Sequence, residues 1–476
     1  MIEQDSLGTL ETPDNVYYGL YSIRSQELNV TPYRSVNVIP EFIKTVYFVK
    51  KCCALANIEI GALPEDLGHA IVQAAEEGME GKFDAHLIVD LYQGNGDVAT
   101  IMNINEILAK RANEILTGKI GYERAKPNDH ASCNQATTDA LMSAARISFY
   151  AYIEKLQKIL QELSNEFAAK SIEHEQTIRV GRTELRDALP VTFGQTFSAY
   201  RDVLARLVKQ GDVVKKELQT IPLGGAAIGN GIGSSPDFGD CAAAIVSRLM
   251  GVEFHCPDNY FDIVQNCDPV MQVANYQQTV AATVTKIAKD IRLLSSGPHA
   301  GLNEVRYPAC APGSVTFPGK TNPVIEELVI RVNMRVGANS GMVAKGLENS
   351  ELEYNYLESF MNIAVMESFE IMCTTYKVLL EKCIAPLEVN TEVARKYAES
   401  TNALAIFLTP VFGYAKATKV GVRCYKEGLS VKEAVVAEEF MTAEEAEYFL
   451  NPINYTDNKK YFSLLKEAKT KFKPVD

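Results

Sequence analysis

The feature that most constrains the fold is a long helical repeat of apolar residues near the middle of the chain. Within residues 271–294, apolar side chains recur every three or four positions. At about 1.5 Å of rise per residue, they form a stripe more than about 30 Å long on one face of a helix. A helix of this length needs neighbours of similar length to cover it. The stripe consists of Val273, Tyr276, Val280, Val284, Ile287, Ile291 and Leu294.

Four further segments show the same periodicity, at residues 138–168, 194–220, 324–345 and 356–383. Together, these five segments predict a mainly α fold built on a long central five-helix bundle, flanked by smaller N- and C-terminal domains.

The segments on either side of the bundle differ from it in pattern. The N-terminal part has shorter elements and turns, and the C-terminal part has two short helices, each opened by a capping box, at Ser430–Glu433 and Thr442–Glu445. The predicted division is an N-terminal domain at 1–133, a central helical bundle at 134–384 and a small C-terminal helical domain at 385–476.

Charge and composition exclude several classes of partner. The 476 residues carry a formal net charge of −13 and no polybasic run, which argues against a nucleic-acid surface. No segment approaches the roughly 18 apolar residues of a membrane span, and the polar, acidic start is unlike a signal peptide. A cytoplasmic enzyme with a small-molecule substrate is therefore expected.

Cysteine and histidine spacing predicts neither a metal site nor a cofactor. The ten cysteines include no CxxC pair, and the six histidines form no HExxH motif. We expect reduced, mostly buried thiols, with any catalysis performed by protein side chains.

A loop rich in glycine and proline carries the most informative polar residues. The stretch "APGSVTFPGKTNPVIEE", residues 311–327, holds Ser314, Lys320, Asn322 and Glu327. Its density of proline and glycine excludes a helix or a central strand, and apolar periodicity resumes at Val324.

Three more loops place small, hydroxyl and amide residues immediately before apolar helical segments. They are "YQGNGDVATIMNINE" (92–106), "NQATTDA" (134–140) and "GRTELRDALP" (181–190). Taken singly, each is more typical of a helix cap than of a site, and Thr137, Thr138 and Thr183 all fit that interpretation.

Taken together, five segments resemble the aspartase/fumarase superfamily in order and spacing, over nearly the whole chain. The last is similar to the signature loop of that superfamily, usually written GSSxMPxKxNP. The segments are "LGTLETPDNVYYGLYSIRSQELN", "GNGDVATIMNINE", "GRTELRDALPVTFGQTF", "LSSGPHAGLNE" and "GSVTFPGKTNP".

The resemblance implies anti β-elimination next to a carboxylate. In these enzymes the first serine of the signature loop acts as the base in its alkoxide form, and Ser314 holds that position. Lys320 and Asn322 match the residues that stabilise the enolate-like charge. The resemblance further implies a homotetramer with a shared core of about 20 helices, in which three subunits contribute loops to each active site.

Three substrate-binding hydroxyls of the superfamily are replaced by hydrocarbon in this chain. Val98 stands for a threonine, Ala136 for a serine and Val315 for the second serine of the signature loop. Each unmade hydrogen bond to a buried carboxylate costs about 1–3 kcal/mol, so dicarboxylates should bind poorly. One carboxylate pocket is expected to survive, around Lys320, Asn322 and Thr183.

Glu184 stands where fumarases have histidine and aspartases histidine or glutamine. The superfamily places this position near the acid that matches Glu327. Two neighbouring carboxylates could make one of them a proton donor at neutral pH. Alternatively, an ionised Glu184 could attract a cationic part of the substrate, or it could simply face solvent.

These observations predict a carbon–nitrogen lyase that eliminates an amine from a carboxylate-bearing amino acid or betaine. The favoured candidate is an ergothionase, which releases trimethylamine from ergothioneine and leaves thiourocanate. Aromatic faces can hold such a cation, and the segment 348–360 offers acids and tyrosines of unknown orientation: Glu351, Glu353, Tyr354 and Tyr356.

Three alternatives remain open. A divergent aspartate ammonia-lyase would keep Thr137 and Thr183, and a fumarate hydratase is disfavoured by Glu184. A structural protein, like the lens crystallins related to argininosuccinate lyase, is disfavoured because Ser314 and Lys320 are both present. The "GNGIG" of residues 229–233 does not complete a dinucleotide-binding GxGxxG motif.

Overall fold

The computed structural model describes residues 1–31 and 35–472. The chain divides into two compact units. Unit 1 comprises residues 1–158, 209–282 and 332–374, and unit 2 comprises residues 159–208, 283–331 and 375–476.

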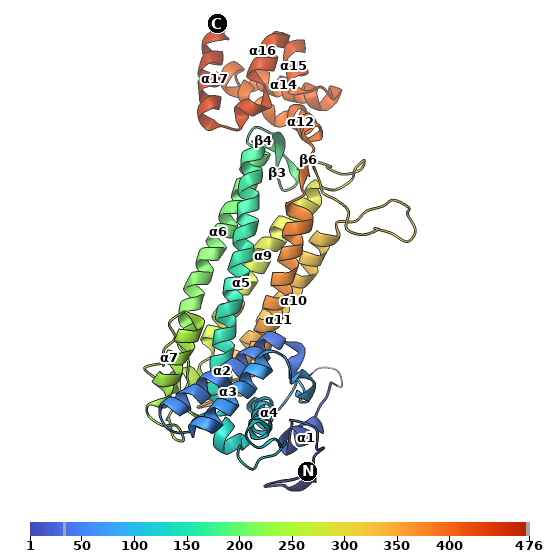
Figure 1. Ribbon diagram of the computed structural model, residues 1–476. Helices are drawn as coiled ribbons and strands as arrows, with labels where there is room; N and C mark the ends of the chain where they lie inside the picture. The colour runs from blue at the N-terminus through green and yellow to red at the C-terminus, as the bar shows by residue number, and fades with distance from the viewer. Residues whose placement is uncertain (32–34, 473–476) are drawn as a thin grey trace. The chain divides into compact units, whose positions relative to one another are not determined.

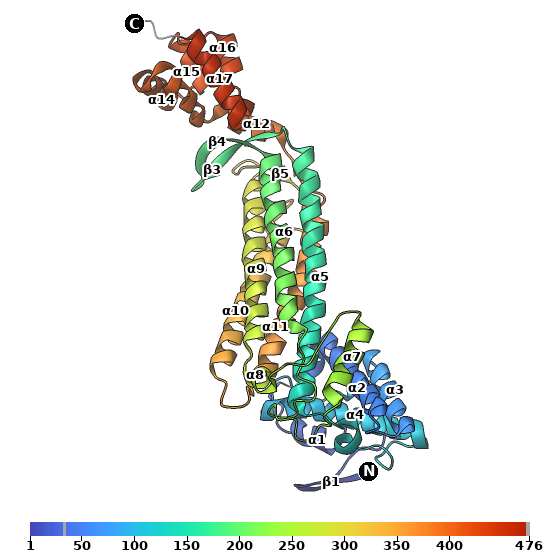
Figure 2. The ribbon, with the colours of Figure 1, turned by 90° about the vertical axis from the view of Figure 1, so that its left-hand side faces the viewer.

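Five long helices confirm the prediction of a mainly helical fold with a central bundle, and Figures 1 and 2 show them running side by side. Every apolar residue of the stripe in 271–294 is buried, at 5% exposure or less. The long helices are α5 (Thr137–Glu173), α6 (Phe193–Leu218), α9 (Asp268–Leu294), α10 (Val324–Glu348) and α11 (Glu358–Leu379).

Polar side chains fasten these helices to one another within each unit. In unit 1, the Gln277 amide on α9 donates to the Val365 carbonyl on α11 at 2.8 Å. In unit 2, the Tyr200 hydroxyl on α6 donates to Asp290 on α9 at 2.6 Å. Both of these polar groups thus find a partner on a neighbouring helix, which helps to fix the register of the bundle.

Unit 1 also contains the short N-terminal elements and two helices from the middle of the chain. Strands β1 and β2 pair antiparallel, and α2 packs against both α3 and α7. The elements are β1 (Ile2–Asp5), β2 (Gly8–Glu11), α1 (Leu20–Gln26), α2 (Pro40–Glu59), α3 (Glu65–Met79), α4 (Val98–Thr117), α7 (Phe238–Met250) and α8 (Tyr260–Gln265).

The glutamate of the "MNINE" segment, Glu106 on α4, caps the N-terminus of α1. Its carboxylate accepts hydrogen bonds from the backbone N–H groups of Gly19 and Tyr21, both at 2.8 Å, and from that of Ser22 at 3.2 Å. The first N–H groups of a helix lack intrahelical partners, so a carboxylate from another helix stabilises them strongly. This residue therefore holds the N-terminal segment against α4.

Unit 2 contains two small antiparallel sheets and the C-terminal helices. Strand β3 pairs with β4, and β5 pairs with β6. The elements are β3 (Ile178–Thr183), β4 (Arg186–Thr192), β5 (Val305–Arg306), β6 (Glu388–Val389), α12 (Thr391–Ser400), α13 (Leu408–Phe412), α14 (Tyr414–Glu427), α15 (Val431–Ala437), α16 (Ala443–Phe449) and α17 (Asn458–Lys471).

A second motif glutamate, Glu304 of "LSSGPHAGLNE", anchors unit 2. Its fully buried carboxylate accepts two hydrogen bonds from the Arg182 guanidinium, each 3.0 Å long, and lies 3.5 Å from Arg179. The Glu304 backbone bonds to the Leu294 carbonyl and to the Asn390 N–H, each at 2.8 Å. One residue therefore ties hairpin β3–β4 to the end of α9 and to β6.

The C-terminal helices enclose a small core of their own, in which the rings of Phe407 and Phe449 stack at 5.9 Å. Helices α15 and α16 begin with the two capping boxes, at Ser430–Glu433 and Thr442–Glu445, and both predictions are confirmed. Among the described residues, no helix combines the length and apolar character that crossing a membrane requires.

Replacing Glu304 by alanine should lower the free energy of unfolding by about 3–5 kcal/mol, because it leaves two buried arginines without a counter-charge. The measurement is urea denaturation followed by circular dichroism. Glu381→Ala is the control, since Glu381 forms a long, exposed ion pair with Lys377 at 3.8 Å and its loss should change little. Equal losses in both variants would contradict the anchoring role.

Candidate active site

The glycine- and proline-rich loop of residues 311–323 is closed at its base by backbone contacts. The Gly313 backbone N–H donates to the Lys320 carbonyl at 2.8 Å, and the side-chain amide of Asn322 donates to the Gly313 backbone carbonyl at 2.7 Å. A Cβ atom at residue 313 would lie 2.7 Å from the Lys320 carbonyl oxygen. Glycine is therefore required there for the loop to close.

Within this loop, the hydroxyl oxygen of Ser314 accepts two hydrogen bonds from backbone N–H groups. The donors are Thr316 at 3.0 Å and Phe317 at 2.9 Å. Donors held at one oxygen stabilise negative charge on it, so the same two groups would stabilise a Ser314 alkoxide. Val315 is fully exposed and Phe317 is 62% exposed, so the apolar side chains of the loop have no cover within the chain.

The end of the loop lines an open cleft of about 1070 Å³ in unit 2. Lys320 and Asn322 contribute to this cleft from the loop, and Leu185 contributes to it from the tip of hairpin β3–β4. Within unit 2, the structure thus brings the end of the signature loop together with the tip of hairpin β3–β4. Arg292, Ser295 and Tyr307 add polar groups to the same wall.

The segment 181–190, predicted as a loop, lies mostly in strands β3 and β4, because its residues pair across a hairpin. Only Glu184 and Leu185 form a turn, and the backbone of that turn is strained. Glu184 and Leu185 both have positive φ, at 53° and 61°, although neither is glycine. Such turns favour glycine or asparagine, and strain of this kind often marks functional sites. Thr183, which ends β3, and Glu184 are both exposed.

Glu327, the other half of the predicted acid pair, lies in the first turn of α10. It is half-buried, and Arg292 lies 3.5 Å from its carboxylate. Its proximity to Glu184 stays a prediction.

In unit 1, Tyr354 joins the first loop, the second loop and the segment 348–360. Its hydroxyl donates to the Gly96 carbonyl at 3.3 Å and also hydrogen-bonds the side chain of Thr138. Val98 begins α4 directly after this loop, and Thr137 begins α5. From the segment 348–360, Tyr354 therefore contacts both loops, and the ring of Phe360 lies 5.6 Å from that of Tyr92 in the first loop. Three other residues of the segment are exposed: Glu351, Glu353 and Tyr356.

Two acids that the sequence did not single out lie beside Tyr354. Burial raises the pKa of Glu358 to about 7, although a 2.8 Å hydrogen bond from Asn362 and the charge of Arg146 both act to lower it. Burial also raises the pKa of Asp97 to about 7, and the nearby Glu358 charge adds to the effect. The Asp97 side chain does not cap α4, the helix that follows it.

The sequence gives only a weak indication that Asp97 and Glu358 belong to a functional site. Asp97 directly follows an Asn-Gly pair and has a left-handed φ of 60°, a conformation that asparagine, aspartate and glycine tolerate best. Glu358 is an acid at the start of a strongly apolar helix.

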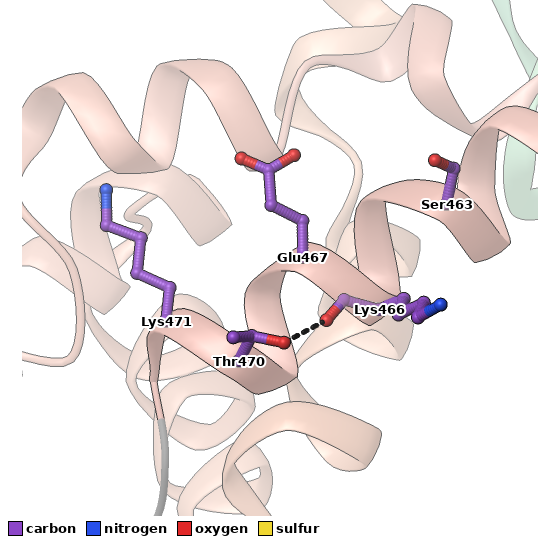
Figure 3. Close-up of a pocket in the computed structure, with 5 residues that line it drawn as sticks. All are labelled: Ser463, Lys466, Glu467, Thr470 and Lys471. Carbon is purple, nitrogen blue, oxygen red and sulfur yellow. Dashed lines mark hydrogen bonds between the residues drawn. The ribbon is translucent and has the colours of Figure 1, made fainter.

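A separate cavity on α17 offers no comparable chemistry (Figure 3). The Thr470 hydroxyl donates to the Lys466 carbonyl at 3.1 Å, Lys471 pairs with Glu445 at 3.0 Å, and Glu467 accepts from the Tyr448 hydroxyl at 3.3 Å. Three of the polar side chains that line this cavity therefore already have partners.

No set of three or more histidine, cysteine or acidic side chains within residues 1–31 and 35–472 is arranged to hold a metal ion. All ten cysteines are free thiols.

Comparison with known families gives matches over most of the chain. A family described as "Lyase" matches residues 11–337, and one described as "Fumarase C C-terminus" matches residues 404–457. An aspartate ammonia-lyase of Bacillus sp is 34% identical over 457 residues, which is 96% of this chain and 97% of the relative. The aspartate ammonia-lyase of Escherichia coli K12 is 33% identical over 446 residues, or 93% of each chain.

Solved structures agree with the sequence matches. A Brucella melitensis fumarate lyase:delta crystallin bound to cobalt superposes with a TM-score of 0.92 at 32% identity, covering 96% of this chain and 99% of the other. A class II fumarase from Schistosoma mansoni superposes with a TM-score of 0.91 at 25% identity, with the same coverage. This chain belongs to the aspartase/fumarase superfamily, and it is a carbon–nitrogen lyase of that superfamily.

Proposed function

We propose that this lyase eliminates an amine from a cationic monocarboxylate, with Ser314 as the base and ergothioneine as the leading substrate. The observation that carries the reaction type is the Ser314 hydroxyl, held by two backbone N–H groups in a loop that also presents Lys320 and Asn322. In this geometry a serine alkoxide and a cationic site for the substrate anion come from one short segment.

In the elimination of trimethylamine from ergothioneine, Ser314 removes a proton from the carbon next to the thiol-imidazole ring. The electrons of that C–H bond form the new double bond. The C–N bond of the neighbouring, carboxylate-bearing carbon breaks, and trimethylamine leaves with its electron pair. The product is thiourocanate, and the proton on Ser314 returns to water. Lys320 and Asn322 would bind the carboxylate on the carbon whose C–N bond breaks, while the negative charge that develops as the proton leaves delocalises into the thiol-imidazole ring.

The acids of unit 1 support a cationic substrate. Asp97 and Glu358 lie beside Tyr354, next to Val98, where the superfamily has a substrate-binding hydroxyl. A pair of partly desolvated carboxylates and a tyrosine ring attract a trimethylammonium group, whereas they repel a second substrate carboxylate. Val98, Ala136 and Val315 remove hydroxyl donors that a dicarboxylate would need.

We further propose a cytoplasmic homotetramer in which three subunits contribute loops to each active site. Ser314, Lys320 and Asn322 belong to unit 2, and Val98, Thr137 and Thr138 belong to unit 1. Assembly would bring the loops of different copies together. Exposed apolar residues on α10 offer surface for such contacts: Val324, Leu328 and Met334.

The second candidate is an aspartate ammonia-lyase that converts L-aspartate to fumarate and ammonia. The observation in its favour is the identity of 33–34% to enzymes of that name over 93–96% of this chain. Ser314, Lys320 and Asn322 serve this reaction equally well. Fumarate hydration is less favoured, because Glu184 holds the position of the fumarase histidine.

Incubating the purified protein with ergothioneine should release trimethylamine and produce the absorbance of a conjugated olefin, while L-aspartate stays unchanged. Ser314→Ala should lower the rate at least about 1000-fold, because it removes the base. Amine release and absorbance are followed together for both substrates. Ammonia from aspartate would favour the second candidate, and an unchanged rate in Ser314→Ala would contradict the assigned base.

The acid pair makes a separate prediction about pH. Both carboxylates gain charge as pH rises through about 7, so the affinity for a permanently cationic ligand should increase between about pH 6 and about pH 8. Ergothioneine binding to the inactive Ser314→Ala variant is measured by calorimetry. Adding Asp97→Asn should weaken binding at the higher pH and flatten the dependence. An affinity independent of pH in both proteins would contradict a cation site at these acids.

A further inference from the structure

A buried acid that the reaction scheme above leaves unused lies behind Tyr307, one of the residues that line the cleft in unit 2. Glu326 lies in the first turn of α10 and is fully buried, whereas its neighbour Glu327 is half-buried and paired with Arg292. The thiol of Cys383 donates to one Glu326 oxygen at 3.8 Å. The other carboxyl oxygen has no partner of good hydrogen-bond geometry within the part of the chain that the structure describes.

Tyr307 connects this buried acid to the cleft. It follows β5 and lines the cleft beside Lys320 and Asn322, and its phenol lies close to the side chains of Glu326 and Ser295. Burial and the Glu326 carboxyl both raise the pKa of the Tyr307 phenol, so its proton stays in place at neutral pH. A phenol that keeps its proton is a hydrogen-bond donor for an anion.

The protonation state of Glu326 decides what Tyr307 can do. An ionised Glu326 carboxylate would accept a hydrogen bond from the Tyr307 hydroxyl. A neutral Glu326 carboxyl can instead donate a hydrogen bond to the Tyr307 oxygen. Burial raises the pKa of Glu326, and hydrogen bonds and the Arg292 charge offset only part of this effect. The titratable and charged groups that face Glu326 are Tyr307, Cys383 and Arg292.

We propose that Tyr307 binds the anionic group of the substrate together with Lys320 and Asn322, and that neutral Glu326 is the positioning residue that frees the phenol proton for it. The chain of donors runs from the Glu326 carboxyl to the Tyr307 oxygen, and from the Tyr307 hydroxyl to the substrate. No covalent step is involved. The identity of the ligand rests on the proposed function. Tyr307 would add one hydroxyl donor to a site in which three substrate-binding hydroxyls of the superfamily are replaced by hydrocarbon.

Binding of urocanate tests this without any turnover, because urocanate carries a carboxylate and an imidazole ring but no leaving amine. Tyr307→Phe should weaken its binding by about tenfold or more, the effect of one hydrogen bond to an anion. Tyr425→Phe is the control, since Tyr425 is 87% exposed on α14 and should leave affinity unchanged. Unchanged affinity in Tyr307→Phe, or no binding to the parent protein, would overturn the proposal.

The pH dependence of urocanate affinity distinguishes a positioning role of Glu326 from a purely structural one. In the parent protein, urocanate affinity should fall as pH rises through the pKa of Glu326. The ionised Glu326 carboxylate then accepts the hydrogen bond of the Tyr307 hydroxyl, which no longer reaches the ligand. Glu326→Gln should keep parental affinity at low pH, since its amide still donates, and should lose the alkaline fall. Glu326→Leu should bind weakly at every pH measured. A Gln variant that binds as weakly as the Leu variant, or that keeps the alkaline fall, would overturn the role of Glu326.

These outcomes are distinguishable from failure of the proposed function. Absence of amine release from ergothioneine would refute the substrate proposal, while a Tyr307-dependent affinity for urocanate would still establish the anion site.

Discussion

The buried carboxylate of Glu304 is the interaction on which the arrangement of unit 2 depends. It fixes Arg182 two residues before the strained turn at Glu184, and its backbone bonds hold the end of α9 and β6 at the same point. A turn with two left-handed, non-glycine residues persists only where the flanking strands are firmly held. The same anchor lies ten residues before Ser314, so it also fixes where the exposed signature loop begins.

Glu106 has the same task in unit 1, where it caps α1 and holds the N-terminal segment on α4. In each unit, a buried motif glutamate holds a segment next to a loop that carries candidate chemistry. The loop residues can therefore change without loss of the fold. Val98, Ala136, Val315 and Glu184 are changes of this kind, and we propose that they alter which substrate the common elimination chemistry accepts.

The sequence predicts the long helices and both capping boxes correctly, because their signals are local: apolar spacing and a Ser or Thr three residues before a Glu. It identifies the signature loop through resemblance and through its glycines and prolines. It does not reveal Tyr307 and Glu326, or Asp97 and Glu358. Their chemistry depends on burial by elements distant in sequence, such as η5 (Leu380–Ile384) against Glu326, and one-dimensional periodicity does not report this.

We propose that one active site combines the loop of Ser314 from one subunit with the Asp97 cluster of another. The direct test is to denature Ser314→Ala and Asp97→Lys variants together, refold the mixture, and measure amine release from the mixed tetramers. Each variant alone should assemble but remain inactive, while the mixture should regain activity, because some sites then receive both intact loops. Mixed tetramers that form without any gain in activity would contradict the claim.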